Sequence, residues 1–522
     1  MKIPVRLIFC FLFLQALQVF AAGTRPDSGT AQSYHYTVDL NALHNDRLKI
    51  GLRFTCPLEG KKAVLCFPKM VPGIYAEMNF GRHIDSLQAI DSEGRQLRIK
   101  RISINEWEIS EAARIAHISY LVSDAWEAFA PRNMGMYFSA ESSFDPDFFV
   151  INQHNLFGFI KGSEHLPFHL EIHYPEGFYG ATSLRRRTEG PGTDHFYARD
   201  YRSLADQPLM YCRPDTTFLQ IGGTRVCVAV YSTTGQPMSA LIAGHLEPLL
   251  QKQVVFLGGK LPVDNYTFLL HHNADAEPDS YRGDGLEHNS STLILLNMRP
   301  DLHLIRANVY GIASHEFLHT LIPLALHSEE IHNFNFMEPE MSQHLWLYEG
   351  LTEYFTQLLP VRSGFINVYT FLENMTGKAR DMQQYDNTLP LTYLSRMAVQ
   401  RQDQYYNFYL RGTLVNMCLD IRLRELSGGT YGVQNMVADL LKVYNKDTPF
   451  RDKELFDVIA RITYGKPVRQ FFKKYVEGGN PPPLEEYLQK AGVRYEPLTQ
   501  VLQEMSEPSE AQVKLRKSWL NQ

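Results

Sequence analysis

Alternation of apolar and polar residues marks the first third of the chain. Between Ser33 and Leu184, apolar residues recur at every second position or in short runs, and turn residues separate the segments. A period of two is typical of half-buried β-strands, and no long amphipathic helix interrupts it. The segments are 34–40, 48–54, 62–67, 97–104, 107–109, 115–122 and 168–174. The pattern predicts an all-β domain, which we place at residues 23–190.

The spacing of the apolar residues changes further along. A second β-rich region at 218–231, 266–271 and 292–296 gives way to helical spacing near residue 302, which continues through 407–426, 433–444 and 453–464. Three prolines at 481–483 mark a loop before a short helix and a charged tail. We therefore expect an α+β multidomain protein. Residues 191–480 would form a β lobe followed by a helical lobe, and 481–522 a C-terminal helix and tail.

The first residues have the features of a secretory signal. Lys2 and Arg6 precede a continuous apolar run at 7–14, and small residues follow at 21–23. The run is too short to span a bilayer. We interpret residues 1–22 as a cleaved signal peptide. The mature protein is expected to be exported, periplasmic or secreted, without a membrane span.

Composition narrows the choice of partners. The formal net charge is −6 and charged residues make up 21% of the chain, so a basic surface for nucleic acid is not expected.

Of the six cysteines, Cys10 lies in the signal. Cys56 and Cys66 bracket one predicted hairpin, and Cys212 and Cys227 bracket another. Either pair could form a disulfide in an oxidising compartment.

The pentad His-Glu-Phe-Leu-His at 315–319 carries the clearest chemistry. It lies in a pattern that predicts a helix reaching at least Leu321. His315 and His319 then lie one turn apart on one face, where two neutral imidazoles can bind one zinc ion. Glu316 falls outside that pair and is expected to act as general base toward a water at the metal. The spacing predicts the site of a zinc peptidase.

Two glutamates compete to be the third ligand. Glu338 follows His319 after eighteen intervening residues, but Pro339 behind it disfavours a helix. Glu349 lies in an apolar run with helical spacing, which predicts a second packed helix beside the first. Because a ligand needs a rigid support, we expect Glu349 to complete the site. Gly350 costs about 1 kcal/mol in a helix relative to alanine, which suggests that a side chain is excluded next to the metal.

Other acidic and histidine side chains near the site receive lesser roles. Glu353, one turn after Glu349, is expected to be a solvated helix carboxylate, with a supporting role at the metal as the alternative. His327, His332 and His344 lack ligand spacing to the pentad and are expected at the surface.

Further motifs accompany the pentad. They are Val71-Pro72-Gly73-Ile74-Tyr75, Arg82-His83-Ile84, Gly285-Leu286-Glu287-His288-Asn289-Ser290-Ser291, Glu349-Gly350-Leu351-Thr352-Glu353-Tyr354, and Tyr409 three residues before Gly412. Together they resemble the glycyl aminopeptidase family of gluzincin zinc metallopeptidases, up to about Val493. The resemblance implies a thermolysin-like catalytic unit, a β lobe then a helical lobe with zinc between them, behind the N-terminal β-domain. It also supports Glu349 over Glu338 as ligand.

The resemblance implies roles for residues outside the zinc set. Tyr409 is expected to donate a hydrogen bond to the oxyanion, as a catalytic residue beside Glu316. Glu287 resembles the carboxylate with which aminopeptidases hold the free α-ammonium of a peptide, and Gly285 lies in the same substrate-binding segment. A carboxylate in that place restricts cleavage to the N-terminal bond. The expected substrates are peptides, with small first residues such as Gly or Ala.

Two features depart from the family pattern. Family members commonly end in a PDZ module, and the thirty residues after Gly492 are too few for one, so none is expected. Leu321 and Ile322 follow the pentad where the family usually shows Trp-Asn, which bears on substrate preference more than on chemistry.

Three functions are compatible with these motifs. The first is an exported zinc aminopeptidase. The second is a zinc endopeptidase of the same fold, which would cut acetylated peptides as well as free ones and would not need Glu287. The third is a non-catalytic protein that kept the fold and binds peptide or glycan. The intact ligand set and Glu316 favour an enzyme over the third.

Overall fold

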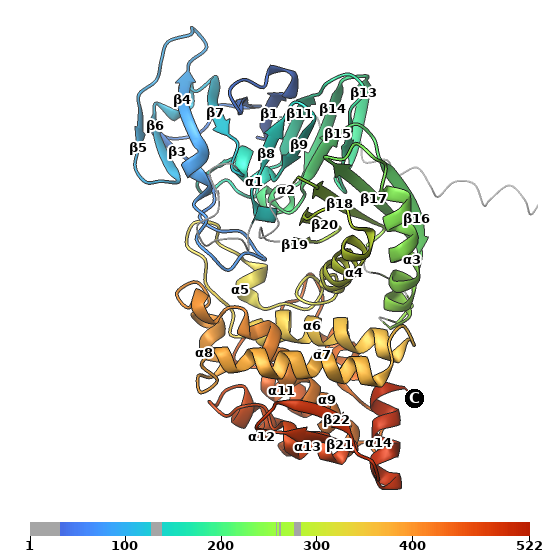
Figure 1. Cartoon of the computed structure of the whole chain (residues 1–522). Coiled ribbons are helices and arrows are strands. Elements are labelled where there is room, and N and C mark those ends of the chain that lie inside the picture. The colour runs from blue at the N-terminus through green and yellow to red at the C-terminus, as the bar shows by residue number, and fades with distance from the viewer. Residues whose placement is uncertain are drawn as a thin grey trace, which may run out of the picture.

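Three tiers of secondary structure follow one another in chain order: a β-domain, a mixed sheet with two helices, and a helical lobe (Figure 1). The computed structural model describes residues 32–521 apart from 127–137, 257, 260, 262 and 276–282. The expected signal peptide, with Cys10, lies outside the described residues. The α+β class and the order of a β-domain before a β lobe and a helical lobe are confirmed.

The described residues of the N-terminal domain form three sheets. The largest has the order β13-β14-β11-β1-β2-β7-β4, and the others have the orders β10-β3-β6-β5 and β12-β15-β9-β8. In β1 buried and exposed residues alternate, as a strand with one face on the core requires. The elements are β1 Tyr34–Asp39, β2 Arg47–Phe54, β3 Lys62–Cys66, β4 Ile84–Ile90, β5 Ile99–Arg101, β6 Glu106–Ser110, β7 His117–Ser123, β8 Ser143–Asp145, β9 Phe148–Ile151, α1 Gln153–Leu156, β10 Phe159–Ile160, β11 Phe168–His173, β12 Tyr179–Ala181, β13 Arg186–Gly190, β14 Thr193–Ala198, α2 Tyr201–Ala205 and β15 Leu209–Cys212.

This domain continues beyond residue 190, where the sequence pattern placed its end. β14 pairs with β11 and β15 pairs with β9, so the paired strands reach Cys212. Neither of the two possible disulfides forms, since no bond joins Cys56 to Cys66 or Cys212 to Cys227. The predicted hairpin between Cys56 and Cys66 does not form, because β2 and β3 belong to different sheets. The one predicted between Cys212 and Cys227 is confirmed, because β16, Thr216–Ile221, pairs antiparallel with β17, Thr224–Ser232, around the turn at 222–223. Alternation along a strand does not reveal which neighbour it pairs with.

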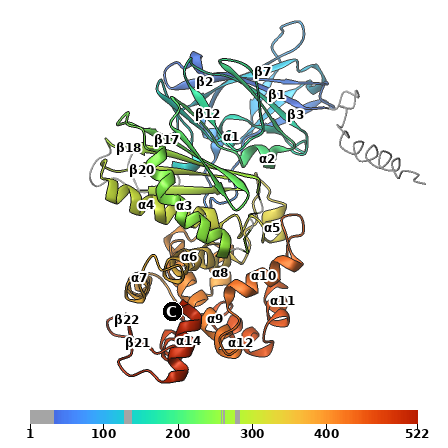
Figure 2. The same ribbon diagram turned by 90° about the vertical axis from the view of Figure 1, so that its right-hand side faces the viewer.

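The second tier is a five-stranded sheet of order β16-β17-β18-β20-β19. Its strands are β16 Thr216–Ile221, β17 Thr224–Ser232, β18 Asn265–Asn273, β19 Gly283–His288 and β20 Ser291–Asn297. Helices α3, Ser239–Phe256, and α4, Leu302–Leu318, pack together on one face (Figure 2). The edge strand β19 runs antiparallel to β20 and next to α4. α4 ends at Leu318, short of the expected Leu321, because the chain turns toward Pro323.

The third tier is the helical lobe. Its elements are α5 Glu329–His332, α6 Leu345–Arg362, α7 Val368–Asp381, α8 Leu391–Arg396, a π-helical turn η8 Phe408–Gly412, α9 Thr413–Leu426, α10 Val433–Val443, α11 Leu455–Ile462, α12 Lys466–Tyr475, α13 Leu484–Lys490, β21 Val493–Glu496, β22 Val501–Glu504 and α14 Glu510–Leu520. The last residues are no tail: Trp519 is fully buried in the core of this lobe and donates to the Tyr354 hydroxyl at 2.8 Å. Across the described part of the chain, no helix combines the length and apolar character needed to cross a bilayer.

Candidate active site

Helices α4 and α6 bring the three expected metal ligands together. The Glu349 Oε2 atom lies 3.4 Å from His315 Nε2 and 3.6 Å from His319 Nε2. One ligand atom from each residue lies within 4.8 Å of the others, and all three side chains are buried. Glu338 stays exposed on a loop away from this group. The helix that supports Glu349 therefore distinguishes the two candidates, as the apolar pattern predicted.

The hydrogen bonds of the two histidines decide which ring nitrogen faces the group. His319 Nδ1 donates to the Ile322 carbonyl at 2.7 Å, and His315 Nδ1 donates to Glu353 Oε2 at 3.0 Å. Each Nε2 lone pair then faces the Glu349 carboxylate. Two lone pairs and a carboxylate repel one another unless a cation lies between them. This donor set of two imidazoles and one carboxylate fits zinc.

The pKa values of the two histidines are shifted in opposite directions. Burial lowers the pKa of His319 to about 4, so its ring is neutral at pH 7. Burial also opposes a charge on His315, but its hydrogen bonds to Glu349 and Glu353 outweigh this effect and raise its pKa to about 10. A proton and a metal ion therefore compete for Nε2 of His315.

Glu353 is a buried partner of the site, so the alternative that gave it a supporting role is correct. Its side chain is 13% exposed and forms an ion pair of 2.6 Å with Lys378 of α7. Lys378 also donates to the Tyr409 carbonyl at 3.2 Å. Burial would raise the pKa of Glu353, yet Lys378 and His315 lower it to about 2. The sequence pattern did not single out Lys378, because its helix follows the ligand helix with no motif of its own.

Glu316 faces the cleft and keeps one oxygen unengaged. Its side chain is buried, and Oε2 finds no hydrogen-bond partner among the described residues. Burial, reinforced by the Glu349 charge, raises its pKa to about 8. Gly285 of β19 makes room for it, since a Cβ atom on Gly285 would lie 2.8 Å from Glu316 Oε1. A carboxylate of this kind is suited to accept and release a proton near neutral pH.

Tyrosines lie close to Glu349. Burial and then the charge of the Glu349 carboxylate raise the pKa of both Tyr75 and Tyr409, and the hydroxyl oxygens of Tyr405 and Tyr409 lie 3.2 Å apart. Tyr409 belongs to the π-helical turn η8, a geometry found often at functional sites. Tyr75 comes from the N-terminal domain. Its motif, 71–75, was recognised in the sequence, but no role at the site was predicted for it.

The missing side chain of Gly350 has a different structural role from the one expected. A Cβ atom on it would lie 2.7 Å from the Gly412 Cα atom and 2.8 Å from the Gly412 carbonyl carbon. The absent side chain therefore lets the backbone of α6 touch the turn that carries Tyr409. It does not make room at the metal.

Glu287 of the edge strand β19 joins the same cleft. One of its carboxylate oxygens lies within 4.8 Å of both Glu316 and His319, each measured at one ligand atom. Burial, followed by the charges of Glu349 and Glu316, raises its pKa. The cleft has a volume of about 340 Å³ and is lined by Glu287, Glu316 and the three ligands among others.

Two of the histidines expected at the surface are buried. His327 is 2% exposed, and its Nδ1 donates to the Pro323 carbonyl at 2.8 Å. His344 is fully buried, with Nε2 2.9 Å from the Asp452 carbonyl. Burial lowers the pKa of both to about 4. Neutral histidines satisfied by carbonyls are compatible with a core, which sequence spacing alone does not reveal.

Comparison with protein families decides the assignment. Residues 35–213 match the Peptidase M61 N-terminal domain, and residues 308–415 match the M61 glycyl aminopeptidase domain. The two matches together cover more than half of the 522 residues. The chain belongs to the M61 glycyl aminopeptidase family. The resemblance inferred from the motifs is confirmed, and the family and its fold make the protein a metallopeptidase.

Solved structures of related peptidases share the fold of this M61 member. An aminopeptidase N family protein from Idiomarina loihiensis aligns with a TM-score of 0.75 at 22% identity, over 89% of this chain and 79% of that one. A mutant M1 zinc metallopeptidase from Deinococcus radiodurans, bound to the substrate Tyr-Ser-Ala, aligns with a TM-score of 0.54 at 15% identity, over 87% of this chain and 95% of that one. Comparison with curated proteins gave no match.

Proposed function

We propose that this chain is an exported zinc aminopeptidase that removes small first residues, such as Gly or Ala, from peptides. The observation that carries the proposal is the position of Glu287. One atom of its carboxylate lies within 4.8 Å of one ligand atom each of Glu316 and His319, and two carboxylates so close together favour a cation between them. The free ammonium of a peptide is such a cation, whereas an acetylated amine or an internal amide is not.

The described side chains support a hydrolytic mechanism. His315, His319 and Glu349 would hold the zinc ion, which when bound supplies Lewis-acid activation of water and of the peptide carbonyl. Glu316 accepts the proton of the attacking water at its unengaged oxygen and delivers it to the leaving amine. The Tyr409 hydroxyl donates to the oxygen that becomes negative. Glu287 holds the ammonium and fixes the first peptide bond over the site.

Cleavage of matched peptides tests the proposal. Ala-Ala-Phe and its N-acetyl form are incubated with the zinc-loaded protein, and products are followed by mass spectrometry. We expect cleavage of the free peptide only, none with Glu316→Gln, and a loss of roughly 10²–10³-fold in kcat/KM with Glu287→Gln at unchanged zinc content. Glu338→Gln, on the exposed loop, serves as control and should retain full activity. Equal cleavage of both peptides would identify an endopeptidase instead, and cleavage of neither a binding protein.

Export is proposed from the first residues of the sequence. The basic residues and apolar run at 1–22 predict removal of this segment. The mature protein purified from its own cells should therefore begin close to residue 23, which N-terminal sequencing can check.

A further inference from the structure

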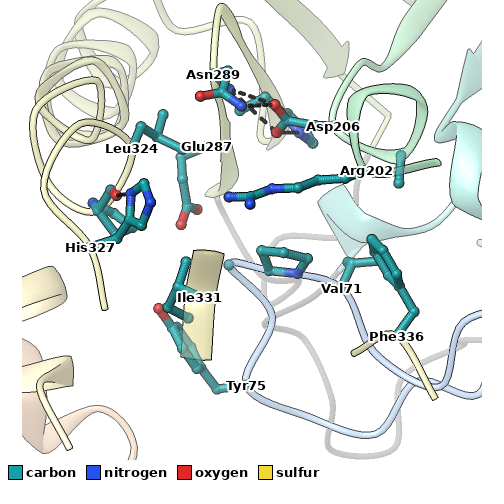
Figure 3. Close-up of a pocket in the computed structure, with 15 residues that line it drawn as sticks. Val71, Tyr75, Arg202, Asp206, Glu287, Asn289, Leu324, His327, Ile331 and Phe336 are labelled. Atoms are coloured by element: carbon teal, nitrogen blue, oxygen red, sulfur yellow. Dashed lines mark hydrogen bonds and ion pairs between the residues drawn. The ribbon is translucent and has the colours of Figure 1, made fainter. Parts of the chain in front are cut away.

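A second cavity lies directly beside Glu287 (Figure 3). It shares Glu287 and Gly73 with the catalytic cleft and has a volume of about 50 Å³. Most of its wall is apolar, formed by Val71, Pro72, Tyr75, Leu324, Ile331 and Phe336. A water needs about 10–15 Å³ measured in this way, so the cavity accepts a group of only a few heavy atoms. When the first residue of a peptide is held at Glu287, its side chain would point into this cavity.

Among the described residues that line the cavity, Arg202 is the one that carries a guanidinium. It belongs to α2 of the N-terminal domain and extends across the cavity toward the Glu287 carboxylate (Figure 3). Nη1 donates to the His332 carbonyl. Within the described residues Arg202 makes no other hydrogen bond and no ion pair. Its remaining N–H donors are therefore available to a ligand.

The other carboxylate of the cavity is already engaged. Asp206 Oδ1 accepts from His288 Nδ1 at 3.3 Å and from the Asn289 backbone N–H at 3.3 Å. Its Oδ2 accepts from the same N–H at 3.2 Å and from the Asn289 side-chain amide. Asp206 thus holds the turn that follows Glu287 and does not pair with Arg202.

Charge decides which short side chain suits this arrangement. Once a peptide ammonium neutralises Glu287, the Arg202 guanidinium faces a second cation nearby, and among the described residues no carboxylate forms an ion pair with it; Asp206 and Asp200 act on it only from a distance. A carboxylate on the same residue as the ammonium would complete an alternating set of charges, and Arg binds carboxylates through charge-assisted, often bidentate hydrogen bonds. Aspartate places such a group on a single methylene, within the size limit of the cavity.

We propose that the cavity beside Glu287 is the subsite for the side chain of the first residue, and that Arg202 makes aspartate its preferred occupant. The proposal rests on the aminopeptidase function proposed above. It refines the expected preference for small residues, since aspartate is short as well as charged. Alanine enters the cavity but leaves Arg202 unpaired, and asparagine offers one uncharged acceptor in place of two charged ones.

Three peptides that differ only in the first residue test the assignment. The kcat/KM values for Asp-Ala-Phe, Asn-Ala-Phe and Ala-Ala-Phe are compared in the wild-type holoenzyme and in Arg202→Gln, which removes the guanidinium and keeps a polar side chain at this position. Arg199→Gln is the control, because this arginine lies just before the same helix with its side chain 75% exposed and outside the cavity. We expect the wild type to prefer Asp over Asn by about 10-fold or more. Arg202→Gln should abolish that ratio, whereas Arg199→Gln should change neither the ratio nor the Ala rate.

Each other outcome refutes a defined claim. An Asp rate no higher than the Asn rate in the wild type overturns the assignment, even if the variant does not fold. If the Asp/Asn ratio of kcat/KM survives in Arg202→Gln, the role of Arg202 is overturned. The same conclusion follows if a folded Arg202→Gln loses activity toward the Ala peptide as much as toward the Asp peptide. Absence of cleavage of all three peptides refutes the aminopeptidase function, and the subsite with it.

Discussion

Replacement of Gly350 by alanine should disturb catalysis more than folding. A Cβ atom at this position would lie 2.7 Å from the Gly412 Cα atom, whereas non-bonded carbons prefer about 3.5–4.0 Å. Neither partner is a side chain that can rotate away, so α6 and the turn 408–412 must separate by about 1 Å. α6 carries Glu349 and the turn carries Tyr409, so both move relative to each other.

The expected change in the free energy of unfolding of Gly350→Ala follows from two opposed effects. Alanine stabilises a helix interior by about 1 kcal/mol relative to glycine, while overpacking costs about 1–3 kcal/mol. The free energy of unfolding of Gly350→Ala should therefore fall by about 0–2 kcal/mol. A displacement of about 1 Å among catalytic groups can cost about 10²-fold, so we expect kcat to decrease by about 10–100-fold.

Gly377→Ala is the matched control. This glycine also lies inside a helix, α7, but a Cβ atom on it would meet no atom within 4 Å. Urea unfolding followed by circular dichroism should show about 1 kcal/mol of stabilisation, with unchanged kcat. If Gly350→Ala behaves in the same way as this control, with higher stability and kcat within about threefold of wild type, the close contact between α6 and the turn is refuted.

Three further predictions concern the surroundings of the ligands. Lys378→Met removes the cation of the buried Glu353 carboxylate and should weaken zinc binding by about 10–100-fold in chelator competition; unchanged affinity would contradict the role of this pair. Asp284 binds its proton more tightly in the folded protein, where burial raises its pKa from 3.8 to about 7, so its contribution to stability falls as pH rises across that window. Between pH 4 and pH 7, the free energy of unfolding of Asp284→Asn, measured by thermal unfolding, should rise by up to about 4 kcal/mol relative to that of the wild type. A difference between the two proteins that does not change with pH would refute this pKa. Gly285→Ala pushes the Glu316 carboxylate aside and should lower kcat by about 10²-fold at full zinc content, so an unchanged kcat would show that the space is not needed.

Local sequence patterns were sufficient to predict the cluster of His315, His319 and Glu349. His315 and His319 lie one helical turn apart, and a helix of any orientation presents them on the same face. The apolar spacing around Glu349 likewise required a packed helix, which distinguished it from Glu338 on a loop. These inferences held because each depends on backbone geometry within a few residues.

Patterns in the β-region were less informative. The alternation was correct for β1, but the domain end at 190 and the hairpin between Cys56 and Cys66 were not, because a strand's partner is set by contacts between distant segments. His327 and His344 show the same limit, since a buried neutral histidine and an exposed one have the same local spacing.

The sequence by itself determined the fold class and the family, and it predicted that His315, His319 and Glu349 come together, because periodicity and short motifs specify what one helix or strand presents. Only the tertiary structure decided which distant groups act together. Lys378 meets Glu353, Tyr75 crosses from the N-terminal domain to Glu349, Gly350 touches Gly412, and Arg202 faces Glu287. Each of these pairs joins separate elements, and their contact depends on how the tiers pack, which no local pattern encodes.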